Sequence, residues 1–125
     1  MATRRVLNVG HCQADHRNIV RLILQHFDAQ IDSADNAEEA LAKLREGTVD
    51  LVLVNRVIDL TGAEGIDLVK EMKRDEALKQ VPVMLVSNRE DAQQEAMQAG
   101  AVRGFGKSAL ENPQTVARLR SYLDS

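Results

Sequence analysis

Short apolar runs alternate with helical hydrophobic patterns along the whole chain. The runs at 5–9, 29–33, 51–54, 81–86 and 102–105 predict five strands. Two of them, 51–54 and 81–86, are continuous aliphatic stretches, which is typical of strands covered by helices on both faces. This alternation indicates crossover units that build a parallel sheet.

The segments between the runs carry apolar residues at helical spacing. The second predicted helix begins after Asn36, with Glu39 placed to complete a capping box, and ends at Gly47. A third helix is predicted over 65–74, and a fifth begins at Asn112 and Pro113. The fourth, over 92–98, has an inward face of alanines and Met97, and we expect it to be mobile. The residues expected to cover the sheet from the first two helices are Ile19, Val20, Ile23, Leu24, Phe27, Ala37, Ala40, Leu41 and Leu44.

The composition indicates one globular domain, 1–125, because the chain is long enough for one hydrophobic core and too short for two. No apolar run approaches the roughly 18 residues of a membrane span, and no export signal is recognised. The single cysteine, Cys12, fits a reducing, cytoplasmic location. A net charge of −3, with two phenylalanines and one tyrosine, argues against direct nucleic-acid binding.

Function in an open parallel sheet gathers beyond the carboxyl ends of the strands. His11 and Cys12 follow the first strand, Asn55 ends the third, Ser87 follows the fourth and Lys107 follows the fifth. These five residues are therefore expected to meet at one edge of the sheet.

Their pattern resembles the receiver domain of two-component response regulators over nearly the whole chain. The run Asp50-Leu51-Val52-Leu53-Val54-Asn55 resembles the family's third strand, and Val81-Pro82-Val83-Met84-Leu85-Val86-Ser87-Asn88 its fourth. The resemblance implies a flavodoxin-like (CheY-like) three-layer α/β/α sandwich, with strand order 2-1-3-4-5 and helices one and five on the same face. It also implies that Ser87 and Lys107 are the family's retained pocket residues and Phe105 its switch aromatic.

Three departures from the family change the expected chemistry. The resemblance places Asn55 at the phosphorylated aspartate, and His11 and Cys12 at the acidic pair that helps to hold magnesium. Magnesium prefers anionic oxygen ligands, and an amide oxygen is a poor nucleophile. Ser108 also replaces the proline that usually follows the lysine, so the family's cis peptide bond is not expected. The chain is therefore interpreted as a pseudo-receiver, with no catalytic residue, metal or cofactor.

The expected function is phosphorylation-independent signalling or scaffolding through protein contacts. In the related domains, the fourth helix, fifth strand and fifth helix commonly form the contact surface. A protein partner, or a second copy of the chain, is expected to bind the corresponding residues: Arg89, Gln93, Met97, Arg103, Phe105, Arg118 and Tyr122.

Several of these residues have alternative roles. Lys107 is expected to donate to the Asn55 oxygen or to backbone carbonyls, because no acidic residue is expected in its pocket. Ser87 is expected to cap backbone groups, and Phe105 is open between switching, packing and partner contact. The runner-up function is a metal- or small-ligand sensor in the crevice around His11, Cys12 and Asn55, with His16 as a further metal ligand.

An enzyme with Cys12 as nucleophile at a helix N-terminus is disfavoured. The chain offers no evident base, and no glycine-rich loop that would hold an anion.

Overall fold

Five parallel strands form one sheet in the order β2-β1-β3-β4-β5, as predicted. The computed structural model describes residues 3–124. The strands are β1 (Arg4–Val9), β2 (Ala29–Ala34), β3 (Leu51–Asn55), β4 (Val83–Val86) and β5 (Val102–Phe105). The helices are α1 (Gln13–His26), α2 (Ala37–Glu46), α3 (Gly65–Arg74), α4 (Glu90–Gln98) and α5 (Pro113–Leu123), with a short 3₁₀ turn η1 (Lys107–Ala109).

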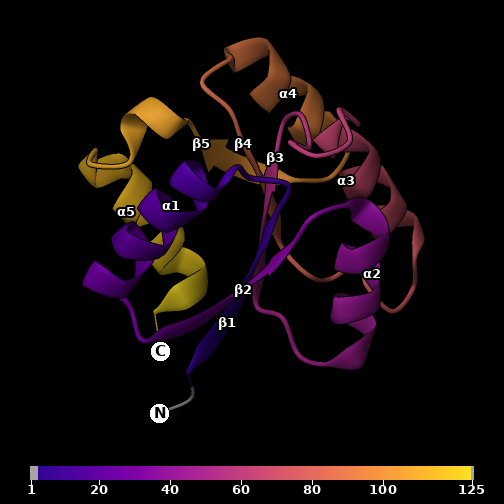
Figure 1. The fold of residues 1–125 in the computed structure, drawn as a ribbon, viewed down its shortest axis with the longest axis horizontal. Coiled ribbons are helices and arrows are strands. Elements are labelled where there is room, and N and C mark those ends of the chain that lie inside the picture. The colour runs from indigo at the N-terminus through magenta and orange to yellow at the C-terminus, as the bar shows by residue number, and fades with distance from the viewer. Residues whose placement is uncertain (1–2, 125) are drawn as a thin grey trace.

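The sheet separates two hydrophobic cores, because successive residues of each strand point to opposite faces. In β3, Leu51 and Leu53 pack with α1 and α5, whereas Val52 and Val54 pack with α2, α3 and α4. Figure 1 shows the resulting layers, with α1 and α5 on one side of the sheet and α2 and α3 on the other. The expected placement of helices one and five on the same face is confirmed.

Two helix starts follow the sequence signals closely. The Asn36 side chain accepts a hydrogen bond from the Glu39 backbone N–H at 2.8 Å, while the Glu39 carboxylate reaches back to the N–H of Asp35 at 3.3 Å. Asn112 likewise accepts from the N–H of Gln114 at 2.9 Å, with Pro113 opening the helix. Each side chain satisfies a backbone donor that has no partner within its helix.

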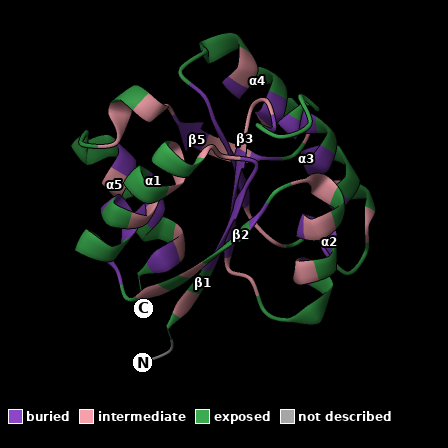
Figure 2. Ribbon diagram, viewed as in Figure 1, coloured by how far each residue is buried: buried purple, intermediate pink, exposed green. Residues whose placement is uncertain are grey.

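Some expectations differ in detail. Leu24 was expected on the buried face of α1 but is 55% exposed, so the buried stripe there is Ile19, Leu22 and Ile23. β4 begins at Val83, two residues later than predicted. Figure 2 shows buried residues along the strands and exposed ones along the outer helix faces. In the described part of the chain, no helix is long and apolar enough to cross a membrane.

Candidate functional site

Asn55 holds the end of β3 against the loop that follows β1. Its Nδ2 donates to the Gly10 carbonyl at 3.1 Å, and the backbone N–H of Asp59 donates to the same oxygen at 2.9 Å. Gly10 has φ of +75°, and a Cβ there would press on the buried Ile58 side chain. The end of β3 and the loop after β1 thus lie close together, and Asn55 donates the hydrogen bond between them. A carboxylate has no N–H group and could not donate this bond.

His11 is fixed over the same edge by a backbone carbonyl. Its Nε2 lies 3.0 Å from the Leu53 oxygen, and because a carbonyl can only accept, the ring proton sits on Nε2. Burial lowers the pKa of His11 to about 4, so the imidazole is neutral at physiological pH. His11 therefore brings neither an anionic oxygen nor a positive charge to the site.

Lys107 has an acidic partner that the sequence interpretation missed. Its Nζ lies 2.7 Å from an Asp15 carboxylate oxygen, joining the η1 turn after β5 to the first turn of α1. This ion pair holds the pKa of Asp15 below its ordinary value. The expectation that Lys107 donates to Asn55 or to backbone carbonyls is wrong. The sequence does place Asp15 in the first turn of a helix that begins at the edge of the sheet where Lys107 lies, and this position indicates the pair.

Cys12 is the N-cap of α1, and its Sγ accepts from the Asp15 backbone N–H at 3.5 Å. The imidazoles nearby bond elsewhere, since His11 contacts Leu53 and the Nδ1 of His16 lies 3.0 Å from Asn8 Nδ2. Within residues 3–124, no three His, Cys, Asp or Glu side chains are grouped so that they could hold a metal ion. The structure thus gives no support to the metal alternative, and the carboxylate that lies beside the Cys12 thiol, that of Asp15, is paired with Lys107.

Ser87 and Ser108 both organise loops at the ends of their strands. The buried Ser87 hydroxyl accepts from the Arg89 backbone N–H at 3.1 Å, which agrees with the expected capping role. Asn88 Oδ1 accepts from the Ser108 backbone N–H at 3.1 Å and from its hydroxyl at 2.9 Å. No cis peptide bond occurs in the described residues.

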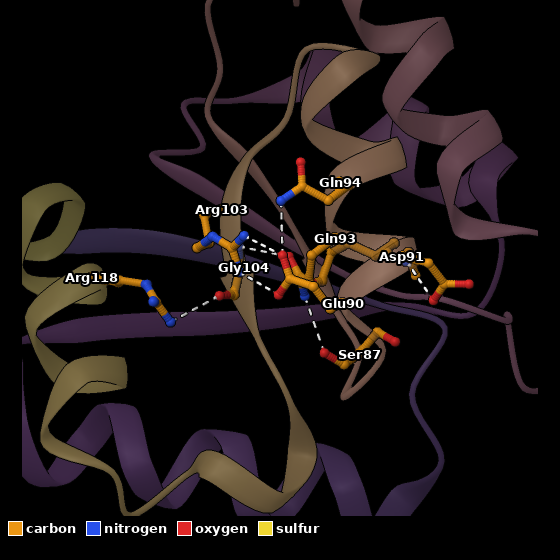
Figure 3. A network of polar contacts seen from close by, with 10 residues as sticks. Ser87, Glu90, Asp91, Gln93, Gln94, Arg103, Gly104 and Arg118 are labelled. Carbon is orange, nitrogen blue, oxygen red and sulfur yellow. Dashed lines mark hydrogen bonds and ion pairs between the residues drawn. The ribbon is translucent and has the colours of Figure 1, made fainter.

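Gln93 was expected on a partner surface, but it is buried, with 4% exposure. Its Nε2 donates to the carbonyls of Leu85 and Ser87 at 2.9 and 3.1 Å, and its Oε1 accepts from the Gly104 N–H at 3.0 Å. The β4–β5 register shifts at this point, between the pairs Met84–Val102 and Val86–Phe105. The Gln93 amide therefore supplies hydrogen-bond partners to backbone groups at the point where the regular β4–β5 pairing is interrupted. Figure 3 shows Gln93 with Ser87 and Gly104.

The outer side of this region is held by ion pairs. Arg103 of β5 makes a two-pronged contact with Glu90 of α4, and this contact lowers the pKa of Glu90 to about 2. Arg118 of α5 donates to the Gly104 carbonyl at 3.4 Å, and Arg89 pairs with Asp91. Of these contacts, the Arg103–Glu90 pair joins α4 to β5, as the Gln93 hydrogen bonds also do. The mobility expected of the fourth helix stays a prediction.

Phe105 is only 3% exposed and packs in the core beside α1 and α5. The proposal that Phe105 contacts a partner is therefore wrong for this structure, and plain packing describes its position. Met97 and Tyr122 are half-buried, while Arg89 is exposed.

Comparison with known proteins matches residues 13–120 to the response regulator receiver domain. The chain is 34% identical to the chemotaxis protein CheY-3 of Vibrio cholerae over 111 residues, which cover 86% of this chain and 80% of that protein. Among solved structures it is similar to a putative response regulator from Chloroflexus aurantiacus (TM-score 0.83, 19% identity, covering 99% of this chain and 100% of that one). It is also similar to the phosphorylated cyanobacterial phytochrome response regulator RcpA (TM-score 0.79, 24% identity, covering 99% and 96%). At these identities the solved structures show the shared fold.

Proposed function

We propose that this chain, which belongs to the response regulator receiver family, relays a signal through protein contacts without being phosphorylated. Membership of the family gives the coarse role, a receiver domain in two-component signalling. The proposed departure is that its signalling does not pass through a phosphoryl group.

The observation that carries this proposal is the donor set at the strand ends. His11 presents a neutral ring, Cys12 a thiol and Asn55 an amide that is already donating to Gly10. Magnesium requires oxygen ligands, preferably carboxylates, and these residues do not fit it. The neighbouring carboxylate of Asp15 is engaged by Lys107 at 2.7 Å. The residues therefore provide neither the nucleophile nor the cation binding that phosphoryl transfer needs.

The protein-contact part of the proposal rests on the surface formed by α4, β5 and α5. This surface presents the guanidinium groups of Arg103 and Arg118 together with the half-buried Met97 and Tyr122, whereas Arg89 lies beside Arg56 and Glu64 on the α3 side of α4. Arginine and aromatic or sulfur-containing side chains are enriched at protein interfaces. Gln93 and Phe105 support this surface from within instead of contacting a partner.

Exposure to a phosphodonor tests the proposal directly. The intact protein is incubated with magnesium and acetyl phosphate, or with magnesium and beryllofluoride, and followed by intact mass and by amide NMR spectra. RcpA, for which a phosphorylated structure exists, is the positive control. The expected result is an unchanged mass and spectrum under conditions that modify RcpA. Stoichiometric addition of a phosphoryl group to this chain would overturn the proposal.

A further inference from the structure

The strand β2 lies at one end of the sheet and pairs with β1 on its inner side. At the two ends of this ladder, the N–H of Arg4 donates to the Asp28 carbonyl and the N–H of Gly10 to the Ala34 carbonyl. Successive residues of a paired strand turn their N–H and C=O groups to opposite sides, so the even-numbered residues of β2 face β1. The residues of β2 that turn their backbone groups away from the sheet are Ala29, Ile31 and Ser33.

Two side chains occupy the outward backbone groups of Ser33. The Asp32 carboxylate accepts from the Ser33 N–H at 2.8 Å, and the Lys43 ammonium of α2 donates to the Ser33 carbonyl. Asp32 and Lys43 also pair with each other at 3.1 Å. Together they satisfy both groups of this edge residue, as a neighbouring strand would. Within residues 3–124, no side chain makes such a contact with the backbone of Ala29 or Ile31.

This block falls where pairing with a second copy would need Ser33 most. An open strand edge is a template on which another strand can continue the sheet. If a second β2 lies antiparallel about a two-fold axis at Ile31, Ile31 faces Ile31, and Ala29 faces Ser33 on both sides. Each of these facing pairs exchanges both of its N–H···O bonds. Since Ser33 belongs to both flanking pairs, its block by Asp32 and Lys43 leaves only the central pair.

The side chains around this edge suit a second copy of the chain. Leu24 is 55% exposed, and at 100° per residue it lies on the side of α1 opposite to Leu22, which faces α5. Leu24 is therefore on the β2 side of α1, on the face of the sheet where the half-buried Ile31 packs. On the other face, the antiparallel arrangement sets Gln30 opposite Asp32, so no like charges meet. A second copy would cover exposed apolar surface at this edge without a charge conflict.

The block is not released by ordinary changes of pH. The hydrogen bond from Ser33, and after it the bond from Lys43, holds the pKa of the Asp32 carboxyl below its ordinary value. The bond to Asp32 likewise raises the pKa of Lys43. A carboxyl with a lowered pKa stays ionised, and an ammonium with a raised pKa stays protonated, throughout the neutral range. Both contacts with Ser33 therefore persist there.

We propose that the outer edge of β2 is a self-association strand for a second copy of this chain, and that Asp32 and Lys43 hold it closed by occupying Ser33. Loss of both contacts opens the edge to antiparallel pairing centred on Ile31. Because β2 and β5 lie at opposite ends of the sheet, this edge is separate from the surface of α4, β5 and α5. Its pairing does not depend on whether the domain is phosphorylated.

Three variants test the proposal in the intact chain. The edge-open variant, Asp32→Ala with Lys43→Met, removes the acceptor and the donor at an exposed and a half-buried position. The matched control, Glu76→Ala with Lys79→Met, makes the same exchanges at an exposed ion pair between α3 and β4. Adding Ile31→Pro to the edge-open variant removes the central N–H. That N–H faces away from β1, so the ladder within the sheet keeps its bonds.

Sedimentation equilibrium measures self-association, and amide hydrogen exchange followed by NMR locates it. The edge-open variant is expected to self-associate about tenfold more tightly or better than the unmodified protein, because two flanking pairs of hydrogen bonds become available. Its Ile31 amide should exchange more slowly as the protein concentration rises. In the unmodified protein and the matched control, exchange at Ile31 should not depend on concentration. Ile31→Pro should return the edge-open variant to the association of the unmodified protein.

The proposal is overturned if the edge-open variant associates no more tightly than the unmodified protein, or if the matched control gains as much. It is also overturned if association leaves exchange at Ile31 unchanged or survives Ile31→Pro, because the contact then lies elsewhere. Concentration-dependent protection of Ile31 in the unmodified protein would show that Asp32 and Lys43 do not hold the edge closed.

Discussion

Replacing Gln93 with glutamate exchanges one NH₂ group for an oxygen at a buried junction of α4, β4 and β5. In the native chain that NH₂ donates to the carbonyls of Leu85 and Ser87, while the other amide atom accepts from Gly104. A carboxylate retains only the last of these bonds. It also places its second oxygen against two carbonyl oxygens in a position that is 4% exposed.

The expected loss of stability is about 3–5 kcal/mol at neutral pH. Two lost donations cost about 1 kcal/mol each, and an uncompensated buried charge beside carbonyl oxygens adds further kilocalories. A domain of this size is stable by about 5–15 kcal/mol, so Gln93→Glu should remove a large share of the total. The isosteric exchange leaves no cavity, and the effect is therefore electrostatic.

The pH dependence distinguishes this mechanism from a general packing defect. Burial and the two carbonyls raise the folded-state pKa of the introduced carboxyl above its unfolded value of about 4.3. The part of the penalty that comes from the charge is then full above the folded pKa, shrinks as pH falls through it, and disappears near the unfolded pKa. The loss of at least one donation remains, because a protonated carboxyl has a single O–H donor. The difference from the unmodified protein should consequently be smaller at about pH 5 than at about pH 7.5.

Urea unfolding at both pH values measures that difference, with Gln98→Glu on an exposed position of the same helix as the control. The control should stay within about 0.5 kcal/mol of the unmodified protein. A loss below about 1 kcal/mol for Gln93→Glu, or an equal loss at both pH values, would refute the reasoning from the Gln93 contacts.

Two further predictions concern the strand ends and the proposed contact surface. Asn55→Asp should lower the free energy of unfolding by about 1–2 kcal/mol, because it loses the bond to Gly10 and sets a carboxylate against that carbonyl. The same variant should still take up no beryllofluoride, and uptake seen by mass or NMR would contradict the assignment of His11 and Cys12 as unfit for magnesium. Arg103→Glu should expose α4 amides to faster hydrogen exchange and weaken binding of a partner protein or second copy. The double exchange Arg103→Glu, Glu90→Arg should restore protection but not binding, so restored binding would show that Arg103 acts only within the fold.

The centre of the sheet is predictable because β3 and β4 are continuous aliphatic runs, which are typical of strands covered on both faces. Leu51 to Val54 are buried on both faces, as that run indicates. The boundaries are harder to predict where a turn competes with the strand. The apolar run predicts that the strand begins at Val81, but the Val81 N–H donates to the Leu78 carbonyl in the preceding turn. Leu24 matches the helical spacing of the apolar residues but faces solvent. A residue at the border of the apolar stripe of a helix can lie on the buried or on the exposed side.

The site was predictable in its residue types and less so in its pairings. That Asn55, His11 and Cys12 lack carboxylates is visible in the sequence, whereas the Asp15–Lys107 ion pair joins residues 92 positions apart and depends on how α1 starts over the sheet. The sequence places Gln93 on the contact surface because related domains commonly use the fourth helix there, and glutamine is usually exposed. Ala96, three residues further along α4, is also buried and indicates which side of the helix faces the sheet. The buried amide itself lies beside the register shift between β4 and β5, which the sequence does not reveal.

The Gln93 junction also sets how many states α4 can occupy. Any shift of the helix along the sheet must break three hydrogen bonds to β4 and β5, at a cost of about 3 kcal/mol if no new bonds replace them. At that cost a displaced helix is populated below about 1%. A partner that binds the native arrangement then keeps almost its full intrinsic affinity. A partner that needs the displaced helix binds about a hundredfold more weakly than its intrinsic affinity for that form. Under the proposed function, a partner would therefore meet α4 in this one arrangement, and binding would cost it no rearrangement of the helix.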